Sequence, residues 1–359
     1  MDEQLKRIIQ LFSQPAFLVN EGVVSWCNSA AASLLCEGTP LSSLLEQQGS
    51  LFSFWDRSGT LQLPVVLGGV DYDASVRSTP EGDLFVASRR GPEMMATAAA
   101  VFNASISLRR PLHSMVSAAS AMFDQMEVSG TLTEAASRLN QSIYQLIRLS
   151  GQMSDGGRLL LHRREVLRRT TDLRSFLLSF FDQAKPLVES LGLTLVCEPP
   201  FSPLFADVDV DLLERALYNL ISNSVNFTPK GGTITISTLR QDMYLLIKVR
   251  DNGEGIRQEV ISNLFERYSD RSLGDSRRGL GMGLPMVREV ARLHGGTIMV
   301  RANEGGHGTA VTFSISLERT PLELRSRTLD YNYCGEFHHG LVELSDVLGA
   351  EFFDPSEIS

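Results

Sequence analysis

An α+β protein of several domains is predicted by the sequence on three grounds. The chain has 359 residues, a length that suits two or three domains at about 150 residues each. Hydrophobic residues make up 43% of it, which is enough to form a buried hydrophobic core in each domain. Its residue pattern also changes twice, from short alternating runs to long helical periodicity and then to alternating helices and strands.

Charge and composition argue against several classes of protein. The 33 Lys and Arg residues stand against 42 Asp and Glu, and the net charge of −9 argues against binding to nucleic acid or to an anionic membrane. The densest basic stretch is interpreted as a solvated helix face. It consists of Arg163, Arg164, Arg168 and Arg169. The four cysteines show no C-x-x-C spacing, so we expect reduced thiols and neither a disulfide framework nor a zinc site.

No stretch of the sequence resembles a membrane anchor or an export signal. A run of about 18 apolar residues without charge is absent, so no membrane span is predicted. Residues 1–14 carry Asp2, Glu3, Lys6 and Arg7, and these charges leave too short an apolar core for a secretory signal. We therefore expect a cytoplasmic protein.

Residues 1–90 predict a small domain of mixed helices and strands. Alternating runs at 16–19 and 84–86 are typical of strands, and Gly, Asn, Asp and Pro signals separate them. The stretch 15–31 resembles the opening strands and first helix of PAS sensor domains. This resemblance implies a PAS-like α/β sensor domain. No Cys or His signature for a haem or flavin stands out, so its ligand stays open.

Residues 91–165 predict a helical hairpin. The first helix carries an apolar seam at Met94, Val101, Leu108, Met115 and Met122, with an adjoining row at Ala98, Leu112 and Ala119. After a break at 129–131, a second helical run carries Leu132, Leu139, Ile143, Leu146 and Met153. A lone hairpin cannot cover both of its faces, so dimerisation into a four-helix bundle is predicted. Packing of the hairpin on its own neighbouring domains is the alternative.

Residues 166–320 alternate between helix and strand. The pattern predicts helices at 172–191, 209–228 and 284–294, and strands at 193–196, 233–238, 244–249, 297–301 and 309–317. In the last strand, apolar side chains from Val311 to Leu317 alternate with Thr312, Ser314 and Ser316. We expect one face of that strand to be buried and the other to be polar.

Polar and glycine-rich clusters within this region predict a site. Asn219 and Asn223 are four residues apart on one helix face, where two amide carbonyls suit a hard cation such as Mg²⁺. Asp251 directly follows a strand and can accept an exocyclic amino proton, and the glycines after it allow close ligand approach. Glycine-rich backbone at the start of a helix offers amide donors to phosphate. These glycines are Gly253 and Gly255 after the strand, and Gly279, Gly281 and Gly283, preceded by Arg278, at the helix.

In this order, and with the stretch 264–268 and the run Gly308-Thr309, the clusters resemble the catalytic and ATP-binding domain of sensor histidine kinases, a GHKL α/β sandwich. The resemblance implies that Asp251 binds the adenine amino group and that Asn223, supported by Asn219, coordinates Mg²⁺. It implies that Gly279, Gly281, Gly283 and Arg278 surround the phosphates, that Gly253 and Gly255 shape the adenine pocket with Thr309 at its edge, and that 266–278 is a lid. Asn226 departs from the family, which usually has Lys or Arg there, unless Arg278 or Lys230 supplies the charge.

The hairpin departs further from the family pattern. Histidine kinases carry H-E-x-x-[TN]-P-L on the first helix, and the run 108–112 aligns with its end without gaps. Ile106 then occupies the phospho-accepting position, with Ser107 in place of the acidic residue and Arg110 in place of Thr or Asn. Because isoleucine has no nucleophilic nitrogen, phosphorylation at that position is impossible. We expect lost chemistry.

His113 offers an alternative acceptor. It lies seven residues after Ile106, which is about 20° from the same helix direction and roughly 10.5 Å further along. Against it, Ser114 rather than a carboxylate follows. A surface or packing histidine is the other interpretation.

Three further features lie towards the C-terminus. His294 is expected to have a structural role at a helix end. The pair His338-His339 is expected in a loop, because no third metal ligand has sensible spacing. Residues 321–359 extend beyond the usual kinase end, and 340–348 resembles an amphipathic helix that packs on the core or binds a partner.

The resemblance implies an ATP- and Mg²⁺-binding protein of two-component signal transduction. The leading hypothesis is degenerate autophosphorylation with a conformational output, through a homodimer or a heterodimer with another kinase, and with a response regulator as partner. One alternative is an active histidine kinase that uses His113 or acts in trans. Another is a GHKL ATPase or a Ser/Thr protein kinase.

Overall fold

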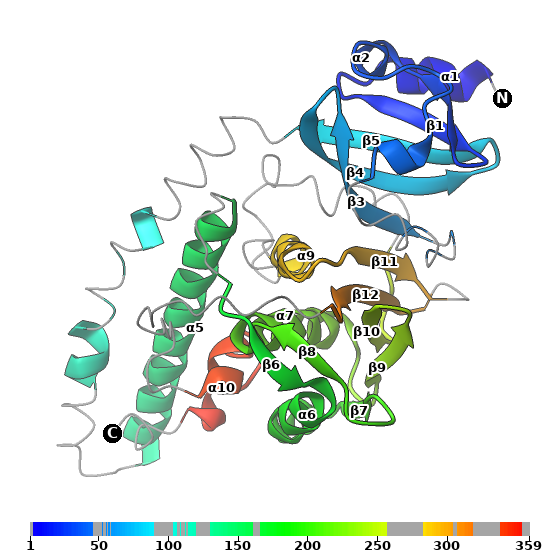
Figure 1. Ribbon diagram of the computed structural model, residues 1–359. Helices are drawn as coiled ribbons and strands as arrows, with labels where there is room; N and C mark the ends of the chain where they lie inside the picture. Colours follow the sequence, from blue (N-terminus) through cyan, green and yellow to red (C-terminus); the bar gives the residue numbers. More distant parts are fainter. Residues whose placement is uncertain are drawn as a thin grey trace.

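The computed structural model arranges the chain as an N-terminal unit, a long helix and a C-terminal unit (Figure 1). It describes residues 3–45, 52, 55, 57, 59–89, 103–105, 108, 112, 114–119, 130–160, 166–256, 283–303, 307–318 and 338–353. We call 3–89 the N-terminal unit, 166–353 the C-terminal unit and 338–353 the C-terminal segment. Within these described ranges, no helix combines the length and apolar character that crossing a membrane requires.

The N-terminal unit is an antiparallel sheet in the strand order β2-β1-β5-β4-β3. Gly68 and Gly69 both have positive φ and form the two-residue turn between β3 and β4, a conformation that suits glycine. Phe17 stacks on Phe85 in the core, with ring centroids 4.9 Å apart. The elements are α1 (Glu3–Gln10), β1 (Ala16–Asn20), β2 (Val23–Cys27), α2 (Ser29–Ala32), the short 3-10 helix η1 (Leu41–Ser43), β3 (Thr60–Leu67), β4 (Val70–Thr79) and β5 (Gly82–Arg89).

The C-terminal unit packs helices on a second group of strands (Figure 1). Its sheet continues in the order β11-β12-β10-β9-β7, and a separate pair joins β6 to β8. Asp172 and Asp209 cap α6 and α7, which explains where these two helices begin. The elements are β6 (Arg169–Asp172), α6 (Leu173–Ser190), β7 (Thr194–Glu198), β8 (Phe205–Val208), α7 (Val210–Phe227), β9 (Thr233–Gln241), β10 (Tyr244–Asp251), α9 (Gly283–Leu293), β11 (Ile298–Ala302) and β12 (Thr309–Ser316). Each helix and strand predicted in this region is present, with ends shifted by a few residues.

One ten-stranded sheet runs through both units, because β3 pairs antiparallel with β11. Gln62, on β3, also accepts a hydrogen bond from the Thr297 hydroxyl through its backbone oxygen. On the neighbouring strand, Asp73 lies 3.7 Å from the Arg288 guanidinium of α9. We call this contact region the sheet joint. The sequence contained no signal for it, since the paired strands lie more than two hundred residues apart.

The sheet joint overturns one expectation for β12. Thr312 and Ser314 were expected on a polar face, but they are only 4% and 3% exposed. Together with Trp55 and Leu61 of the N-terminal unit they line a small cavity at the joint. The prediction of a single buried face was wrong because the N-terminal unit covers the second face.

The long helix α5 (Gly130–Leu160) is the second predicted hairpin helix. Of the first, residues 103–105, 108, 112 and 114–119 are described and helical. Leu112 and Ala119, from the adjoining row, are buried, whereas Leu108 and Met115 of the predicted seam are 42% and 45% exposed. The described part of the first helix thus turns Leu112 and Ala119 inward, while Leu108 and Met115 of the seam stay exposed.

The C-terminal segment is a short helix, α10 (His339–Glu343), followed by turns and the 3-10 helix η3 (Ala350–Phe352). It was expected to be helical over 340–348, so the helix is shorter than predicted. His338 is its N-cap and His339 its first residue, which corrects the expected loop. The segment packs against α5, α6 and α7.

Two of the four clustered arginines do not lie on a helix. Arg169 opens β6, and the Arg168 guanidinium donates a hydrogen bond to the Leu293 oxygen at 2.6 Å. The interpretation as a helix face was therefore wrong for this pair, while Arg163 and Arg164 lie outside the described residues. Cys27, Cys36 and Cys197 are free thiols, and Cys334 also lies outside.

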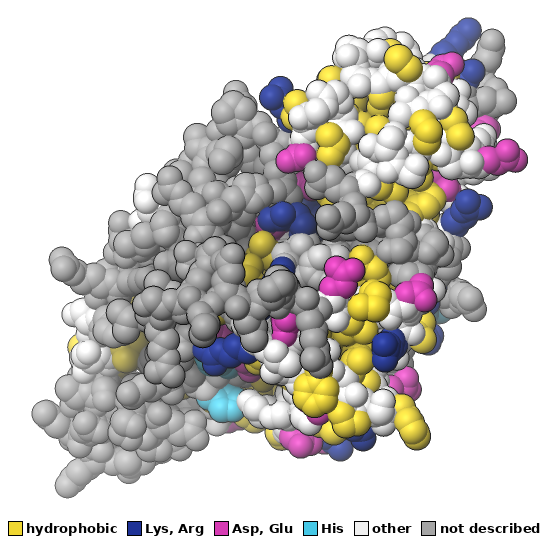
Figure 2. All heavy atoms as spheres, in the orientation of Figure 1, with side chains coloured by type: hydrophobic (Ala, Val, Ile, Leu, Met, Phe, Trp, Pro, Cys, Tyr) yellow, Lys and Arg dark blue, Asp and Glu magenta, His cyan; other side chains and the backbone are white. Residues whose placement is uncertain are grey.

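Exposed hydrophobic side chains gather on the C-terminal unit over α6, β7 and β8 (Figure 2). Phe201 is fully exposed, and Phe205 is 49% exposed. Leu178 and Val196, both 37% exposed, belong to the same elements. None of the residues placed by the structure covers Phe201.

Candidate nucleotide-binding site

Helix α7 carries the two predicted asparagines on one face. Its first turn is fixed by Asp209, whose carboxylate accepts from the Leu212 amide at 3.1 Å and from the Leu167 amide at 3.0 Å. Asn219 is 3% exposed, and its amide nitrogen donates to the Arg215 oxygen at 2.8 Å. This bond leaves the Asn219 side-chain oxygen available towards the start of α9. Asn223, one turn later, is half-buried.

Gly283 brings the start of α9 against both asparagines. A Cβ at this glycine would lie 3.2 Å from the Asn219 side-chain oxygen and 3.4 Å from the Asn223 side-chain nitrogen. Met286, one turn further, places its sulfur 3.7 Å from the Asn219 amide nitrogen. The predicted metal-binding helix and the end of the predicted phosphate loop therefore meet, although they lie about sixty residues apart in sequence.

Asp251 ends β10 and is 5% exposed. One of its carboxylate oxygens accepts from the Gly253 and Thr309 amides, each at 3.0 Å. The other lies 3.5 Å from the Ser224 hydroxyl. Burial raises the pKa of the Asp251 carboxyl, and these hydrogen bonds oppose part of that effect. The carboxylate is thus held rigidly by groups from three segments.

Glycines are required around Asp251 by close backbone approach. A Cβ at Gly253 would lie 2.2 Å from the Phe227 oxygen, which is too close for any other residue. A Cβ at Gly308 would lie 2.1 Å from the Asp251 oxygen, and Gly308 also has φ of +82°. Gly255 has φ of +79°. The run after β10 and the turn before β12 therefore pack on each other and on the end of α7.

Asn226 stands where the family usually has a cation. It is exposed, and its side chain donates to the Ser222 oxygen at 3.0 Å, one turn earlier on α7. Lys230 is exposed and its aliphatic carbons approach Gly192. Arg278, Gly279 and Gly281 lie outside the described residues, as do Ile106, Ser107, Arg110 and His113. Their predicted roles stay predictions.

Sequence reasoning missed the groups that hold Asp251 and α7. Ser224 and Asn303 contact Asp251, the latter through its side-chain nitrogen to the Asp251 backbone oxygen at 2.7 Å. Asn303 follows β11 and no motif includes it. His294 has the structural role expected, because its Nδ1 donates to the Val290 oxygen at 2.8 Å and its Nε2 accepts from the Asp209 amide at 3.0 Å. Burial lowers the pKa of His294, which keeps the ring neutral for this pairing.

Comparison with protein-family models gives a match over residues 208–319. The matching family is described as histidine kinase-, DNA gyrase B-, and HSP90-like ATPase. Residues 208–319 are a domain of this family. The ATPase domain therefore includes Asn219, Asn223, Asp251 and Thr309, and extends from β8 to just beyond β12.

Relatives extend the similarity beyond the ATPase domain. The histidine protein kinase DivJ of Caulobacter vibrioides is 30% identical over 264 residues, which are 72% of this chain and 44% of DivJ. The sensor-like histidine kinase SenX3 of Mycobacterium bovis is 30% identical over 226 residues, 60% of this chain and 52% of SenX3. The chain thus spans about half the length of these relatives. Together with the ATPase domain, they support a histidine kinase family for this chain.

A solved structure agrees with this fold. The crystal structure of full-length ShkA in complex with AMPPNP aligns with a TM-score of 0.50 and 22% identity, covering 64% of this chain and 47% of that one. At this identity the likeness concerns the fold. It supports the predicted α/β architecture of the ATPase domain.

Proposed function

We propose that this protein binds ATP with Mg²⁺ in its ATPase domain and acts in two-component signalling through nucleotide-dependent conformation. The observation that carries the proposal is the meeting of Gly283 with Asn219 and Asn223, beside a buried Asp251. A phosphate loop and a hard-cation site must be neighbours to serve one nucleotide. Because residues 208–319 are a domain of an ATPase family, ATP is the expected nucleotide.

The residues present fit a magnesium ion. The Asn219 side-chain nitrogen donates to the Arg215 oxygen, so the Asn219 side-chain oxygen faces Gly283. An oxygen atom is the ligand that Mg²⁺ prefers. The side-chain nitrogen of Asn223 lies towards Gly283, so Asn223 would supply its oxygen as the second ligand after rotation of its amide, and Mg²⁺ would offset the charge of the phosphates. Asp251 would accept the adenine amino proton, in a position that its amide donors already fix.

Signalling without autophosphorylation follows from Ile106, which occupies the position aligned with the family's phospho-acceptor. An aliphatic side chain cannot accept a phosphoryl group. Binding of nucleotide would instead change the position of the ATPase domain on the hairpin and so the affinity for a response regulator or a kinase partner.

A dimer through the hairpin is part of this proposal. Leu108 and Met115 on the first helix are 42% and 45% exposed, and Leu139 and Leu146 on α5 are 41% and 37% exposed. Apolar rows on both helices of a hairpin favour a four-helix bundle. Replacing Leu139 and Leu146 by lysine should convert a dimer into a monomer in sedimentation equilibrium. A wild-type monomer at tens of micromolar would contradict the dimer.

The deciding experiment is incubation with Mg²⁺ and ATP labelled at the γ-phosphate, with wild type and His113→Ala. We expect nucleotide at a hundredfold excess over Kd to increase the free energy of unfolding by about 2.7 kcal/mol, which raises the midpoint of thermal unfolding. We expect no covalent label on the protein. Acid-labile label that disappears in His113→Ala would instead establish a histidine kinase. Acid-stable label would indicate a Ser/Thr kinase, and steady phosphate release an ATPase. No thermal shift would overturn nucleotide binding itself.

A further inference from the structure

The C-terminal segment is part of the core of the C-terminal unit. Val342, Leu344 and Phe353 are at most 1% exposed and belong to the same apolar cluster as α6 and α7. Gly340 approaches so closely that a Cβ there would lie 2.8 Å from both the Leu187 methyl and the Tyr218 hydroxyl. The segment is therefore fixed to the ATPase domain and is not a loose extension.

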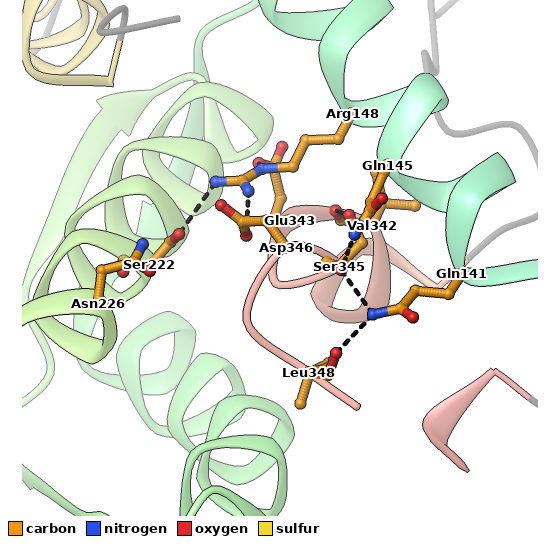
Figure 3. A network of polar contacts seen from close by, with 10 residues as sticks. All are labelled: Gln141, Gln145, Arg148, Ser222, Asn226, Val342, Glu343, Ser345, Asp346 and Leu348. Carbon is orange, nitrogen blue, oxygen red and sulfur yellow. Dashed lines mark hydrogen bonds and ion pairs between the residues drawn. The ribbon is translucent and has the colours of Figure 1, made fainter. Parts of the chain in front are cut away.

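Helix α5 binds the other side of the segment through side chains that donate to its backbone (Figure 3). Gln141 donates to the Leu348 oxygen at 2.7 Å, and Gln145 donates to the Ser345 oxygen at 2.9 Å. Asn140, which directly precedes Gln141 on α5, donates to the Phe353 oxygen at 3.2 Å. These bonds satisfy carbonyls that the short α10 and its following turns leave without helical partners.

Arg148 joins three elements at one guanidinium (Figure 3). It extends from α5 and is 9% exposed. It forms an ion pair with Asp346, lies 3.6 Å from the Glu343 carboxylate, and donates to the Ser222 hydroxyl on α7 at 3.1 Å. Ser222 directly precedes Asn223, so the cation is tied to the turn of α7 that carries the proposed metal ligand.

The charges explain why the contact is specific. Glu343 is 3% exposed, and a buried carboxylate is costly without a cation beside it. Arg148 supplies that cation only when α5 lies against the segment. Moving α5 away would leave Glu343 in an apolar core beside Tyr218, whose pKa is raised by burial and by nearby carboxylates that include Glu343.

We propose that the C-terminal segment is an intramolecular latch that holds the hairpin helix α5 on α7 of the ATPase domain. Release of Arg148 opens the latch and frees the ATPase domain to move relative to the hairpin. Because Arg148 also donates a hydrogen bond to Ser222, opening of the latch and the position of the Asn223 side chain are coupled. The latch itself exists without nucleotide, so it can be tested apart from the proposed function.

The test is hydrogen–deuterium exchange of the full chain without nucleotide, comparing Asp346→Asn and Arg148→Met with wild type. We expect amides of residues 141–150 to exchange about tenfold faster in Asp346→Asn and about a hundredfold faster in Arg148→Met, where two carboxylates lose their cation. Amides of β10 should exchange as in wild type, since the sheet does not depend on the latch.

Matched controls distinguish the latch from general loss of charge. Glu351→Gln removes a carboxylate from the same segment, and Arg138→Met removes an exposed cation, paired with Glu134, from the same helix. Both should exchange as wild type. Unchanged exchange in both test variants, equal acceleration in β10, or the same effect in Glu351→Gln would overturn the latch. Nucleotide affinity, measured separately, decides the proposed function and leaves this result unaffected.

Discussion

Asp251 illustrates how a few backbone contacts prepare a side chain for binding. Its carboxylate is buried, and two amides hold one oxygen in place. Burial of a charge disfavours the ionised form of the carboxyl. A hydrogen-bond donor on a bound ligand can offset part of this cost. Asparagine at this position keeps an oxygen for the two amides and replaces the second oxygen by a donor.

Asp251→Asn should weaken nucleotide binding by about 10- to 100-fold, because the proposed charge-assisted hydrogen bond to the adenine amino group is lost. Without nucleotide, the variant should be at least as stable as wild type at neutral pH. The raised pKa means that the Asp251 contribution to stability is present at acid pH and is lost as pH rises through the folded pKa. Calorimetric titration and thermal unfolding check both statements, with Asp242→Asn in the β9–β10 turn as control. Unchanged affinity would exclude Asp251 from the nucleotide site.

His339 adds a titratable contact between the C-terminal segment and α7. Its Nδ1 lies 3.2 Å from a Glu214 carboxylate oxygen, and this partner raises the pKa of His339 above its ordinary value of 6.5. Arg215 and Asp211, also on α7, are further charged groups that act on the ring. Because the folded pKa is raised, the stabilisation is complete below the ordinary pKa and disappears as pH rises through the folded one.

His339→Gln should therefore lower stability by about 1 kcal/mol at pH 5.5 and by much less at pH 9. Thermal unfolding across this range, at low salt, measures the difference. His307→Gln, at an exposed position before β12, is the matched control and should show no such difference. An effect of His339→Gln that is the same at both pH values would indicate packing rather than charge.

Helices and strands followed the local pattern closely. Helix α7 begins after its Asp209 cap and α9 begins at Gly283, each within one residue of the expected position. These boundaries are local, because capping side chains and apolar periodicity act over a few residues. The residues that hold the elements together were not predictable in this way. No motif in the sequence includes Arg148, and only its distant partners Ser222 and Asp346 give it a role.

Gly283 is where α9 meets α7, so its substitution tests that contact. In Gly283→Ala the added methyl would displace Asn219 and Asn223 by a few tenths of an ångström. We expect nucleotide affinity in the presence of Mg²⁺ to fall about tenfold, while helix propensity keeps stability within about 1 kcal/mol of wild type. Titration with and without Mg²⁺ measures the change. Full affinity would show that the site tolerates displacement of the two amides.

At the scale of the whole molecule, the sheet joint connects the N-terminal unit to the C-terminal unit. Backbone pairing between β3 and β11, the Arg288–Asp73 ion pair and the cavity-lining contacts of Trp55 connect the two units. A shared sheet transmits displacement better than a flexible linker, because its strands move together. Helix α9, which begins at the end of the predicted phosphate loop, packs on β11 and therefore lies next to this connection.

Gly59→Val should break this connection. Gly59 has φ of +101°, and a Cβ there would lie 2.4 Å from the Val300 oxygen of β11. We expect wild type to unfold in one calorimetric transition and Gly59→Val to unfold in two, as the units separate. Gly22→Val is the control, because Gly22 also has positive φ but a Cβ there meets nothing within 4 Å. A single transition in Gly59→Val would show that the units do not depend on the joint.

Apolar periodicity and glycine motifs, which are local features of the sequence, indicated the helices, the strands and the order of the site motifs. The three-dimensional structure was needed to show that both faces of β12 are buried, that the C-terminal segment lies between α5 and α7, and that one sheet spans both units. These features depend on pairs such as Gln62 with Thr297, which lie 235 positions apart. A local pattern records which face of a strand or helix is apolar, but the partner that covers this face is selected by the folded chain as a whole.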